Sequence, residues 1–489
     1  MKRFFRVAII FIFASVGVLS CTDRDDIIDI PEAIQVQSFI WKGLNQYYLW
    51  QADVPDLADN LFATQSDLNS FLQSKGAPGN LFQNLLNKPI SQFPIATAVD
   101  RFSILVNNYT SLENLFQGVS TSTGMSYGLI EKTGSATELF GWVRYVLPNS
   151  SAASKNVSRG MIFYGVNGTQ LTSSNASSLL GLSAFTINLA DFNGGNITPN
   201  NVSIALTKSV VNENPVYFAQ TFTIGTRKIG YLVYNSFTSN NESQLNTAFG
   251  QFKADGVTHL VLDLRYNPGG AVKTAARLAS MITGQFSGQV FANIQWNGKV
   301  QAFFQANNPD QLVEKFPTTL ADGSNINSLN LTKLYVITSG RTASASELVI
   351  NGLEPYITLV KIGSKTVGKN VGSITLYDSP NFSATNRNPN HKYAMQPLVI
   401  KLANKNGFSD YQNGINPTNV MPEDLGNLGQ LGSTTEPLLS ATLTFIANGG
   451  RFAQPNYLIF DDFKDQKSIE GRFESEMYLE KMPSFKRLQ

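Results

Sequence analysis

Cysteine and histidine are almost absent from this sequence. Among 489 residues, Cys21 is the only cysteine, and His259 and His391 are the only histidines. A disulfide within the chain, a zinc site with thiolate ligands and a protease built on a cysteine and histidine pair are therefore excluded.

Charged residues are scarce as well, at 15% of the chain, and their signs nearly cancel, with 37 Lys and Arg against 35 Asp and Glu. A near-neutral chain without a cluster of Lys and Arg has no basic surface that could replace the counterions of DNA or RNA. We therefore exclude nucleic acid as a partner. Apolar residues, at 42%, and aromatic residues, at 11%, indicate a globular protein with a large core. At roughly 150 residues per domain, the length allows about three domains.

Long apolar runs are missing except near the N-terminus. Lys2, Arg3 and Arg6 precede an apolar run at 7–19, and no later run approaches the roughly eighteen residues of a membrane-spanning helix. As a helix, the first run would reach only about 20 Å across a hydrocarbon core of about 30 Å. It therefore predicts a signal peptide over residues 1–20.

The apolar run ends in Val18-Leu19-Ser20-Cys21, which resembles the lipobox of bacterial lipoproteins. The resemblance implies that Cys21 is lipidated, that residues 21–34 are a tether, and that the lipid holds the protein at a membrane. We therefore expect the protein in the cell envelope of a Gram-negative-type bacterium, anchored to the outer membrane and either periplasmic or exposed at the surface. The alternative is a buried cysteine beside a short core helix.

The chain after the tether changes its pattern twice. Apolar residues recur three and four apart in the first part, which predicts a helical N-terminal domain at 35–119. Short strands separated by Gly, Asn and Ser follow, which predicts a β-rich domain at 120–215 with a hairpin turn at Asn167-Gly168. The expected strands of this domain are Tyr127 to Ile130, Gly141 to Leu147, Gly160 to Val166 and Val202 to Leu206.

The β-rich segment resembles a PDZ domain of the bacterial type at 146–153, 159–162 and 166–168. The resemblance implies that Tyr127, Gly128, Leu129 and Ile130 form the loop and strand that receive the C-terminus of a peptide. The alternative is a β-rich packing domain with no ligand.

Strands alternate with helices at 216–449, which predicts an α/β core, and residues 450–489 form a C-terminal tail. The expected elements are strands at Ile229 to Tyr234, Leu260 to Leu264 and Leu334 to Thr338, and helices at about Glu242 to Phe252, Ala271 to Ile282 and Ser344 to Leu353. In such cores the functional residues lie at the junctions where a strand ends and the next helix begins.

The first of these junctions runs from Asp263 to Gly270 and reads DLRYNPGG. Gly269 and Gly270 let the backbone approach a ligand closely, and N–H groups at the start of a helix point outward, so the turn is a candidate oxyanion cradle. The alternative is a tight structural turn in which Asp263 and Arg265 form a pair.

The second junction places Ser344 at the start of a helix, near free N–H groups that suit a nucleophile whose attack creates an oxyanion. The alternative is purely structural, because Ser344 and Glu347 have the spacing of a capping box, worth about 1 kcal/mol.

A serine nucleophile needs a base, and neither histidine is well placed in the sequence to supply one, although folding can still bring His391 near. A lysine can act as the base when burial disfavours its ammonium form. Lys369 lies among small and apolar neighbours, with Lys361 and Lys365 as rivals.

Three segments together, 263–270, 344–347 and 368–369, resemble the C-terminal processing (tail-specific) peptidases, serine peptidases with a serine and lysine dyad. Further matches are Ile229-Gly230-Tyr231-Leu232 and Gly414-Ile415-Asn416-Pro417. The spacing of 25 residues between Ser344 and Lys369 matches the family and selects Ser344 over Ser346.

The family resemblance implies that Ser344 attacks the scissile carbonyl, that Lys369 is the general base, and that the N–H of Ala345 with that of Gly269 or Gly270 holds the oxyanion. No metal or cofactor is required. Ser373 stands where many members have a Gln or Glu that orients the lysine, so its hydroxyl is a candidate for that role.

The expected fold class is thus multidomain α+β, with a helical N-terminal region, a PDZ-like domain and an α/β catalytic core of this peptidase type. The expected function is a serine endopeptidase of the cell envelope that acts on polypeptides engaged by their C-terminus. The alternatives are a peptide-binding lipoprotein without turnover and an envelope scaffold that works through its PDZ-like edge.

Overall fold

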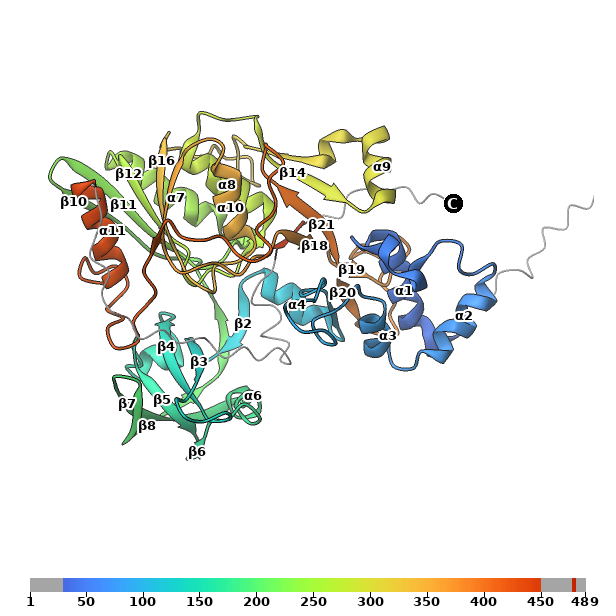
Figure 1. Ribbon diagram of the computed structural model, residues 1–489, viewed down its shortest axis with the longest axis horizontal. Helices are drawn as coiled ribbons and strands as arrows, with labels where there is room; N and C mark the ends of the chain where they lie inside the picture. Colours follow the sequence, from blue (N-terminus) through green and yellow to red (C-terminus); the bar gives the residue numbers. More distant parts are fainter. Residues whose placement is uncertain (1–29, 450–476, 481–489) are drawn as a thin grey trace, which may run out of the picture.

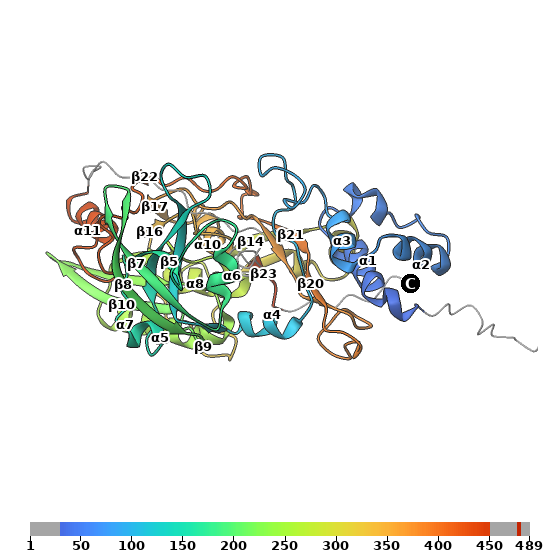
Figure 2. The same ribbon diagram turned by 90° about the horizontal axis from the view of Figure 1, so that it is seen from below.

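The computed structural model describes residues 30–449 and 477–480. The predicted signal peptide, Cys21, all of the predicted tether before Ile30 and most of the predicted tail lie outside the described residues. Figures 1 and 2 show an elongated molecule with the N-terminal helices at one end and α11 at the other. Within the described part of the chain, no helix is long and apolar enough to cross a membrane.

The N-terminal region is helical, as predicted. Its helices are α1 (Gln35–Tyr47), α2 (Gln65–Ser74), α3 (Pro78–Asn84) and α4 (Tyr109–Phe116), with short 3-10 turns η1 (Glu32–Ile34), η2 (Gln51–Asp53) and η3 (Pro55–Leu57). Helix α1 buries Phe39, Ile40 and Leu44 against the main core, and each such side chain contributes about 1.5–3 kcal/mol. The short strand β1 (Ile104–Val106), which the sequence pattern does not indicate, pairs antiparallel with β20.

Most strands of the β-rich segment form one antiparallel sheet in the order β3-β4-β5-β7-β8, with β6 paired to β5, while β2 and β9 form a separate two-stranded sheet. Its elements are β2 (Val119–Ser122), β3 (Met125–Glu131), β4 (Leu139–Val146), α5 (Ser151–Ser154), β5 (Ile162–Val166), β6 (Thr169–Gln170), α6 (Ala176–Gly181), β7 (Ala184–Asn193), β8 (Asn196–Thr207) and β9 (Ser209–Asn212). The predicted hairpin turn is confirmed, because Asn167 and Gly168 both have positive φ, 53° and 78°, and join the paired strands β5 and β6.

The α/β core is built on a second sheet in the order β10-β11-β12-β16-β17-β22, parallel from β11 onward. Its elements are β10 (Val216–Ile224), β11 (Arg227–Tyr234), η4 (Ser239–Asn241), α7 (Glu242–Ala254), β12 (His259–Asp263), α8 (Val272–Thr283), β16 (Lys333–Thr338), α10 (Ala345–Leu353), β17 (Thr358–Gly363), β22 (Asn419–Val420) and α11 (Pro437–Asn448). The strands and helices predicted for this core are confirmed, with ends within two residues of the expected ones. Both faces of the sheet are buried: α7, α8 and α10 pack on one, and α11 on the other.

A third sheet lies beside the core in the order β13-β23-β18-β21-β14-β15. It comprises β13 (Gly270–Ala271), β14 (Val290–Trp296), β15 (Val313–Lys315), β18 (Val371–Ser373), β21 (Leu398–Ala403) and β23 (Met477–Tyr478). Helix α9 (Gly298–Asn307) and the turn η5 (Pro309–Leu312) lie between β14 and β15 in the sequence, and β19 (Leu376–Tyr377) and β20 (Ala394–Gln396) form a separate three-stranded sheet with β1. Strand β23 comes from the predicted tail and was not expected from the sequence.

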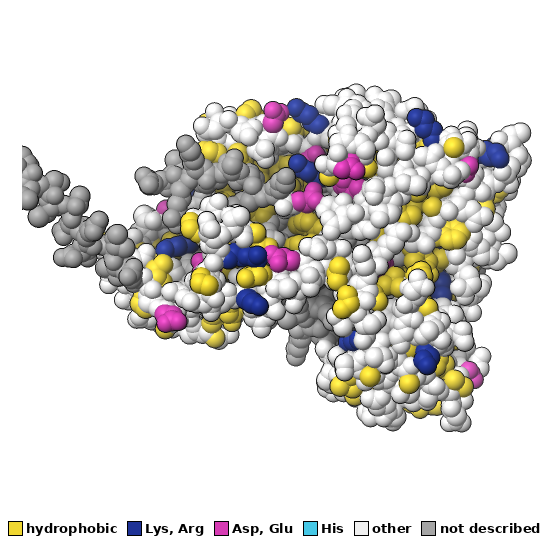
Figure 3. All heavy atoms as spheres, turned by 180° about the vertical axis from the view of Figure 1, so that it is seen from behind, with side chains coloured by type: hydrophobic (Ala, Val, Ile, Leu, Met, Phe, Trp, Pro, Cys, Tyr) yellow, Lys and Arg dark blue, Asp and Glu magenta, His cyan; other side chains and the backbone are white. Residues whose placement is uncertain are grey.

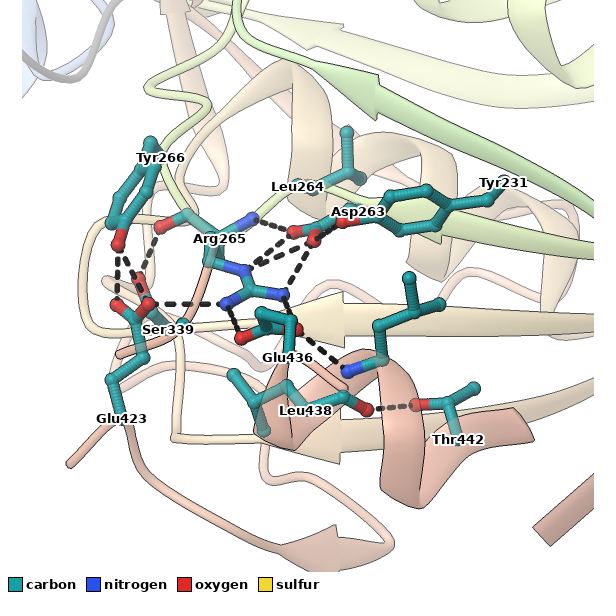
Figure 4. A network of polar contacts seen from close by, with 12 residues as sticks. Tyr231, Asp263, Leu264, Arg265, Tyr266, Ser339, Glu423, Glu436, Leu438 and Thr442 are labelled. Atoms are coloured by element: carbon teal, nitrogen blue, oxygen red, sulfur yellow. Dashed lines mark hydrogen bonds and ion pairs between the residues drawn. The ribbon is translucent and has the colours of Figure 1, made fainter. Parts of the chain in front are cut away.

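A buried ion network surrounds Arg265 in the core (Figure 4), and Arg159 joins the β-rich segment to it. Arg265 is fully buried between Asp263 and Glu436, at 2.7 Å from each, and also contacts Glu423 at 3.1 Å. Arg159, from the β-rich segment, binds the same Glu423 at 2.6 Å. Burial alone would raise the pKa of Glu423, but the two guanidinium groups lower it to about 2. The predicted pairing of Asp263 with Arg265 is thus present.

Candidate active site

Ser344 lies at the N-terminus of α10. Its backbone has a conformation that residues other than glycine rarely adopt, with φ 64° and ψ −116°. The residue is fully buried. The segment has the layout of a capping box, and Glu347 accepts the Ser344 N–H at 2.8 Å. The Ser344 hydroxyl itself makes no hydrogen bond within the described part of the chain. Its oxygen is therefore left available for chemistry.

Lys369 is the one fully buried lysine among the residues that the structure describes. Its side chain is fully buried, and its Nζ lies 4.8 Å from the centre of the Phe102 ring. The two rivals differ, because Lys361 pairs with Glu354 at 2.9 Å and Lys365 is exposed. Its burial distinguishes Lys369 from both rivals.

Glu347 connects the two candidate catalytic residues. Its Oε2 accepts the backbone N–H of Ser344 and of Lys369, each at 2.8 Å, and its Oε1 accepts the N–H of Gly368 at 2.7 Å and the Thr366 hydroxyl. Burial raises the pKa of Glu347, and these four donors oppose that rise. The sequence pattern indicated this residue only as a helix cap, and its contact with residues 366–369 arises from the tertiary fold.

The glycine turn lies against the start of α10. The Asn267 carbonyl accepts hydrogen bonds from the Ala343 N–H, at 3.2 Å, and the Ser346 hydroxyl, at 3.1 Å. Ser346 therefore uses its hydroxyl in the scaffold, which favours Ser344 as the nucleophile. The Gly269 N–H donates to Asn267 Oδ1 at 2.9 Å, so Gly270 is the better oxyanion candidate of the two glycines. Gly270 has φ 140°, and a Cβ there would lie 2.5 Å from the Phe237 carbonyl oxygen.

The candidate oxyanion donors Gly270 and Ala345 thus come from the two strand-to-helix junctions that the sequence indicated. Gly270 belongs to β13, and Ala345 is the first residue of α10, where backbone N–H groups have no partner within the helix. The common contact at the Asn267 carbonyl keeps the two junctions together.

The N-terminal region supplies part of the site, which the sequence did not indicate. Arg101 donates to the Gly368 carbonyl at 2.5 Å and to the Gln412 carbonyl at 2.9 Å, while the neighbouring Phe102 covers the Lys369 amine. Asp100 accepts the Phe102 N–H at 3.1 Å and the Tyr48 hydroxyl of the buried helical core at 2.7 Å. Burial lowers the pKa of the Arg101 guanidinium, and Glu347 opposes this effect.

Ser373 lies in β18, and its hydroxyl donates to the Met477 carbonyl at 3.2 Å. Its role in orienting Lys369 stays a prediction. Neither histidine hydrogen-bonds Ser344: His391 contacts Asp378 at 2.9 Å, and the His259 ring lies 2.9 Å from the Thr258 hydroxyl. Among the described residues, no three His, Cys, Asp or Glu side chains gather as a metal site.

The candidate peptide-binding residues Tyr127, Gly128, Leu129 and Ile130 all lie inside β3, so they are strand residues, whereas the sequence suggested a loop and a strand. Strand β3 is at the edge of its sheet and pairs with β4 on one side. Gly128 has no room for a side chain, because a Cβ there would lie 2.2 Å from Trp142 Nε1.

Two models of protein families match parts of this chain. The family model described as peptidase family S41 matches residues 228–408, and the model described as the peptidase S41 N-terminal domain matches residues 35–104. A crystal structure of an S41 protease from Bacteroides fragilis is similar, with 25% identity and a TM-score of 0.64, over 84% of this chain and 98% of that one.

Two curated relatives carry names of the same kind. The carboxyl-terminal-processing protease of Picosynechococcus is 24% identical over 252 residues, which cover 52% of this chain and 53% of the relative. The chloroplastic C-terminal processing peptidase of Tetradesmus obliquus is 27% identical over 179 residues, which cover 35% of this chain and 34% of the relative. The chain thus spans about half or less of the length of these relatives.

Proposed function

Because this chain belongs to peptidase family S41, we propose that it is a serine endopeptidase that cleaves polypeptides through an acyl-enzyme. The Ser344 Oγ attacks the scissile carbonyl carbon while the Lys369 Nζ takes the hydroxyl proton. The N–H groups of Ala345 and Gly270 stabilise the resulting oxyanion, a contribution usually worth about 3–4 kcal/mol. The protonated lysine then gives its proton to the leaving amine, and water attacks the acyl-enzyme by the same route.

The observation that carries this proposal is the buried Ser344 hydroxyl without a hydrogen-bond partner, combined with the shared attachment of Ser344 and Lys369 to Glu347. Buried polar atoms are normally hydrogen-bonded, and a catalytic role is one of the reasons for an exception. The strained backbone of Ser344 supports the same interpretation, because such conformations cluster at active sites.

The proposal extends to how the substrate is held and where the protein works. The edge strand β3 is suited to pair with the extended C-terminus of a polypeptide, in the manner of a PDZ domain. A lipid on Cys21 would hold the enzyme at the outer membrane, on the periplasmic or the outer side. Ser373 is proposed to help orient Lys369.

The catalytic part is tested with Ser344→Ala and Lys369→Ala. Each variant should lose cleavage of an unfolded polypeptide and keep the melting temperature of the wild type to within a few degrees, whereas Lys361→Ala, at a lysine paired on the surface, should cleave normally. A fluorophosphonate reagent should modify Ser344 in the wild type and in the Lys361→Ala variant. Normal cleavage by either dyad variant would reject the mechanism.

The remaining parts have separate tests. Amidation of a peptide's C-terminus should weaken its binding, and equal affinity would remove the PDZ-like role of β3. Cys21→Ser should release the protein from membranes into the soluble fraction, and unchanged membrane retention would remove the lipid anchor. A wild type that binds C-terminal peptides but cleaves nothing would instead be a peptide-binding lipoprotein or a scaffold.

A further inference from the structure

Strand β23 connects two segments that carry the proposed chemistry. It lies between β13 and β18, with Met477 paired to Gly270 and Tyr478 paired to both Ala271 and Ser373. The Leu479 N–H donates to the Ser373 carbonyl at 3.0 Å. Strand β13 begins at the candidate oxyanion residue Gly270, and β18 ends four residues after Lys369.

The side chains of this short segment are held on both sides. Met477 is fully buried in the main core, and Leu479 packs against the same core. Tyr478 is 6% exposed, and its ring centre lies 4.1 Å from that of Phe116, the last residue of α4. Residues 477–479 are thus held by packing contacts beside the candidate active site.

The place that β23 occupies has the features of a binding groove for an extended polypeptide. Gly270 and Ala271 offer backbone edges on one side, and the Ser373 carbonyl and hydroxyl offer an acceptor and a donor on the other. A peptide that took this place would run past Gly270, which belongs to the proposed oxyanion site. Addition of a strand to open sheet edges gives affinity through main-chain hydrogen bonds.

We propose that the groove between β13 and β18 binds the substrate as an extended strand, and that residues 477–479 of this chain occupy it in the resting molecule. This proposal rests on the proposed peptidase function. The groove takes a long unbranched apolar side chain at the position of Met477 and an aromatic one at the position of Tyr478. Substrate enters by exchanging with the chain's own strand, so the segment limits the resting activity.

The alternative is a permanent strand that completes the sheet, and one pair of variants in the full-length chain separates the two. Leu479→Pro removes the N–H that bonds Ser373, whereas Leu479→Ala keeps it and removes only the side chain. The readout is the rate at which a fluorophosphonate phosphonylates Ser344 with loss of fluoride, followed by mass spectrometry. We expect Leu479→Pro to be phosphonylated about five times or more faster than Leu479→Ala, because the open state is more populated. An equal or slower rate would overturn the proposal.

A second variant removes a contact on the other side of β23. It keeps the proposal testable if the proline variant does not fold. Phe116→Ala removes the ring beside Tyr478 and leaves β23 unchanged in sequence. It should also speed the phosphonylation of Ser344 by the fluorophosphonate and the cleavage of an unfolded polypeptide such as casein. A slower reaction together with a lower melting temperature would show that the strand is part of the permanent scaffold.

Binding is measured separately from catalysis with a labelled peptide that has the sequence of residues 474–483. The peptide should bind the Ser344→Ala, Leu479→Pro double variant at least about tenfold more tightly than it binds Ser344→Ala alone, because the groove is vacated. A peptide with Asp at the position of Met477 should not bind. Binding without cleavage by any version of the chain would keep the groove and reject the peptidase, whereas cleavage without tighter binding would keep the peptidase and reject the groove.

Discussion

Ser344 and Lys369 are tied together through one atom, because their backbone N–H groups both donate to Glu347 Oε2, each at 2.8 Å. The proposed nucleophile lies at the start of a helix and the proposed base in a loop before β18. Both hydrogen bonds come from backbone N–H groups, so the carboxylate holds the backbone of each residue without using the Ser344 hydroxyl.

The first prediction concerns this carboxylate. Glu347→Gln keeps the shape of the side chain but brings an NH2 group against backbone donors, so the two residues should lose their alignment. We expect kcat to fall about tenfold to a hundredfold, since hydrogen bonds to a charged group contribute about 1.5–3 kcal/mol. Glu354→Gln, at the other end of α10, is the matched control and should keep the wild-type kcat and KM. A normal kcat for Glu347→Gln would remove its positioning role.

The second prediction concerns the cover that the N-terminal region places on Lys369. Phe102→Ala should admit water to the amine and lower kcat about tenfold, while Phe102→Leu, which keeps an apolar cover, should retain most of the activity. Phe93→Ala, at an exposed position of the same segment, serves as the control. The measurement is steady-state kinetics on an unfolded polypeptide. Equal kcat values for the alanine and leucine variants of Phe102 would contradict the prediction that an apolar cover over Lys369 supports catalysis.

The third prediction concerns the glycine turn. In Gly270→Ala, the new methyl group would meet the Phe237 carbonyl oxygen at 2.5 Å in a backbone region that favours glycine. The turn must shift, so we expect kcat to fall about a hundredfold or more, as for loss of an oxyanion donor. Gly298→Ala, where a Cβ meets nothing within 4 Å, should be unchanged in activity. Full activity of Gly270→Ala would exclude this turn from the oxyanion site.

The fourth prediction concerns pH and the buried ion network. The pKa of Glu423 is lowered from 4.5 to about 2, so its carboxylate stabilises the fold above pH 4.5, and this stabilisation is lost as the pH falls from 4.5 through about 2. The loss corresponds to about 3 kcal/mol. Urea unfolding should show a gap in stability between wild type and Glu423→Gln that is constant from pH 7 to 5 and narrows below. A gap independent of pH would reject the assignment.

The sequence predicted the parts of the fold that depend on local pattern. The continuous apolar runs of β12 and β16 and the spacing in α7, α8 and α10 are properties of neighbouring residues, and the structure confirms these elements. The two junctions could be located for the same reason, since each directly follows a buried strand.

Contacts between distant segments could not be predicted from the sequence. Glu347 looked like a helix cap because its second set of donors lies 19 to 22 residues away. The sequence around Arg101 and Phe102 contains no motif that points to the site, and only folding brings the two residues to Lys369. Strand β23 has two residues, which is too short for an alternation to be visible.

The contact between Arg101 and the Gly368 carbonyl spans 267 residues of sequence. During synthesis from the N-terminus, the segment that will cover the lysine is therefore made long before the lysine itself. A growing chain cannot hold Lys369 beneath Phe102 until about three quarters of its residues have been translated. An early stop in that interval leaves out the lysine, so the proposed catalytic centre can assemble only late in synthesis.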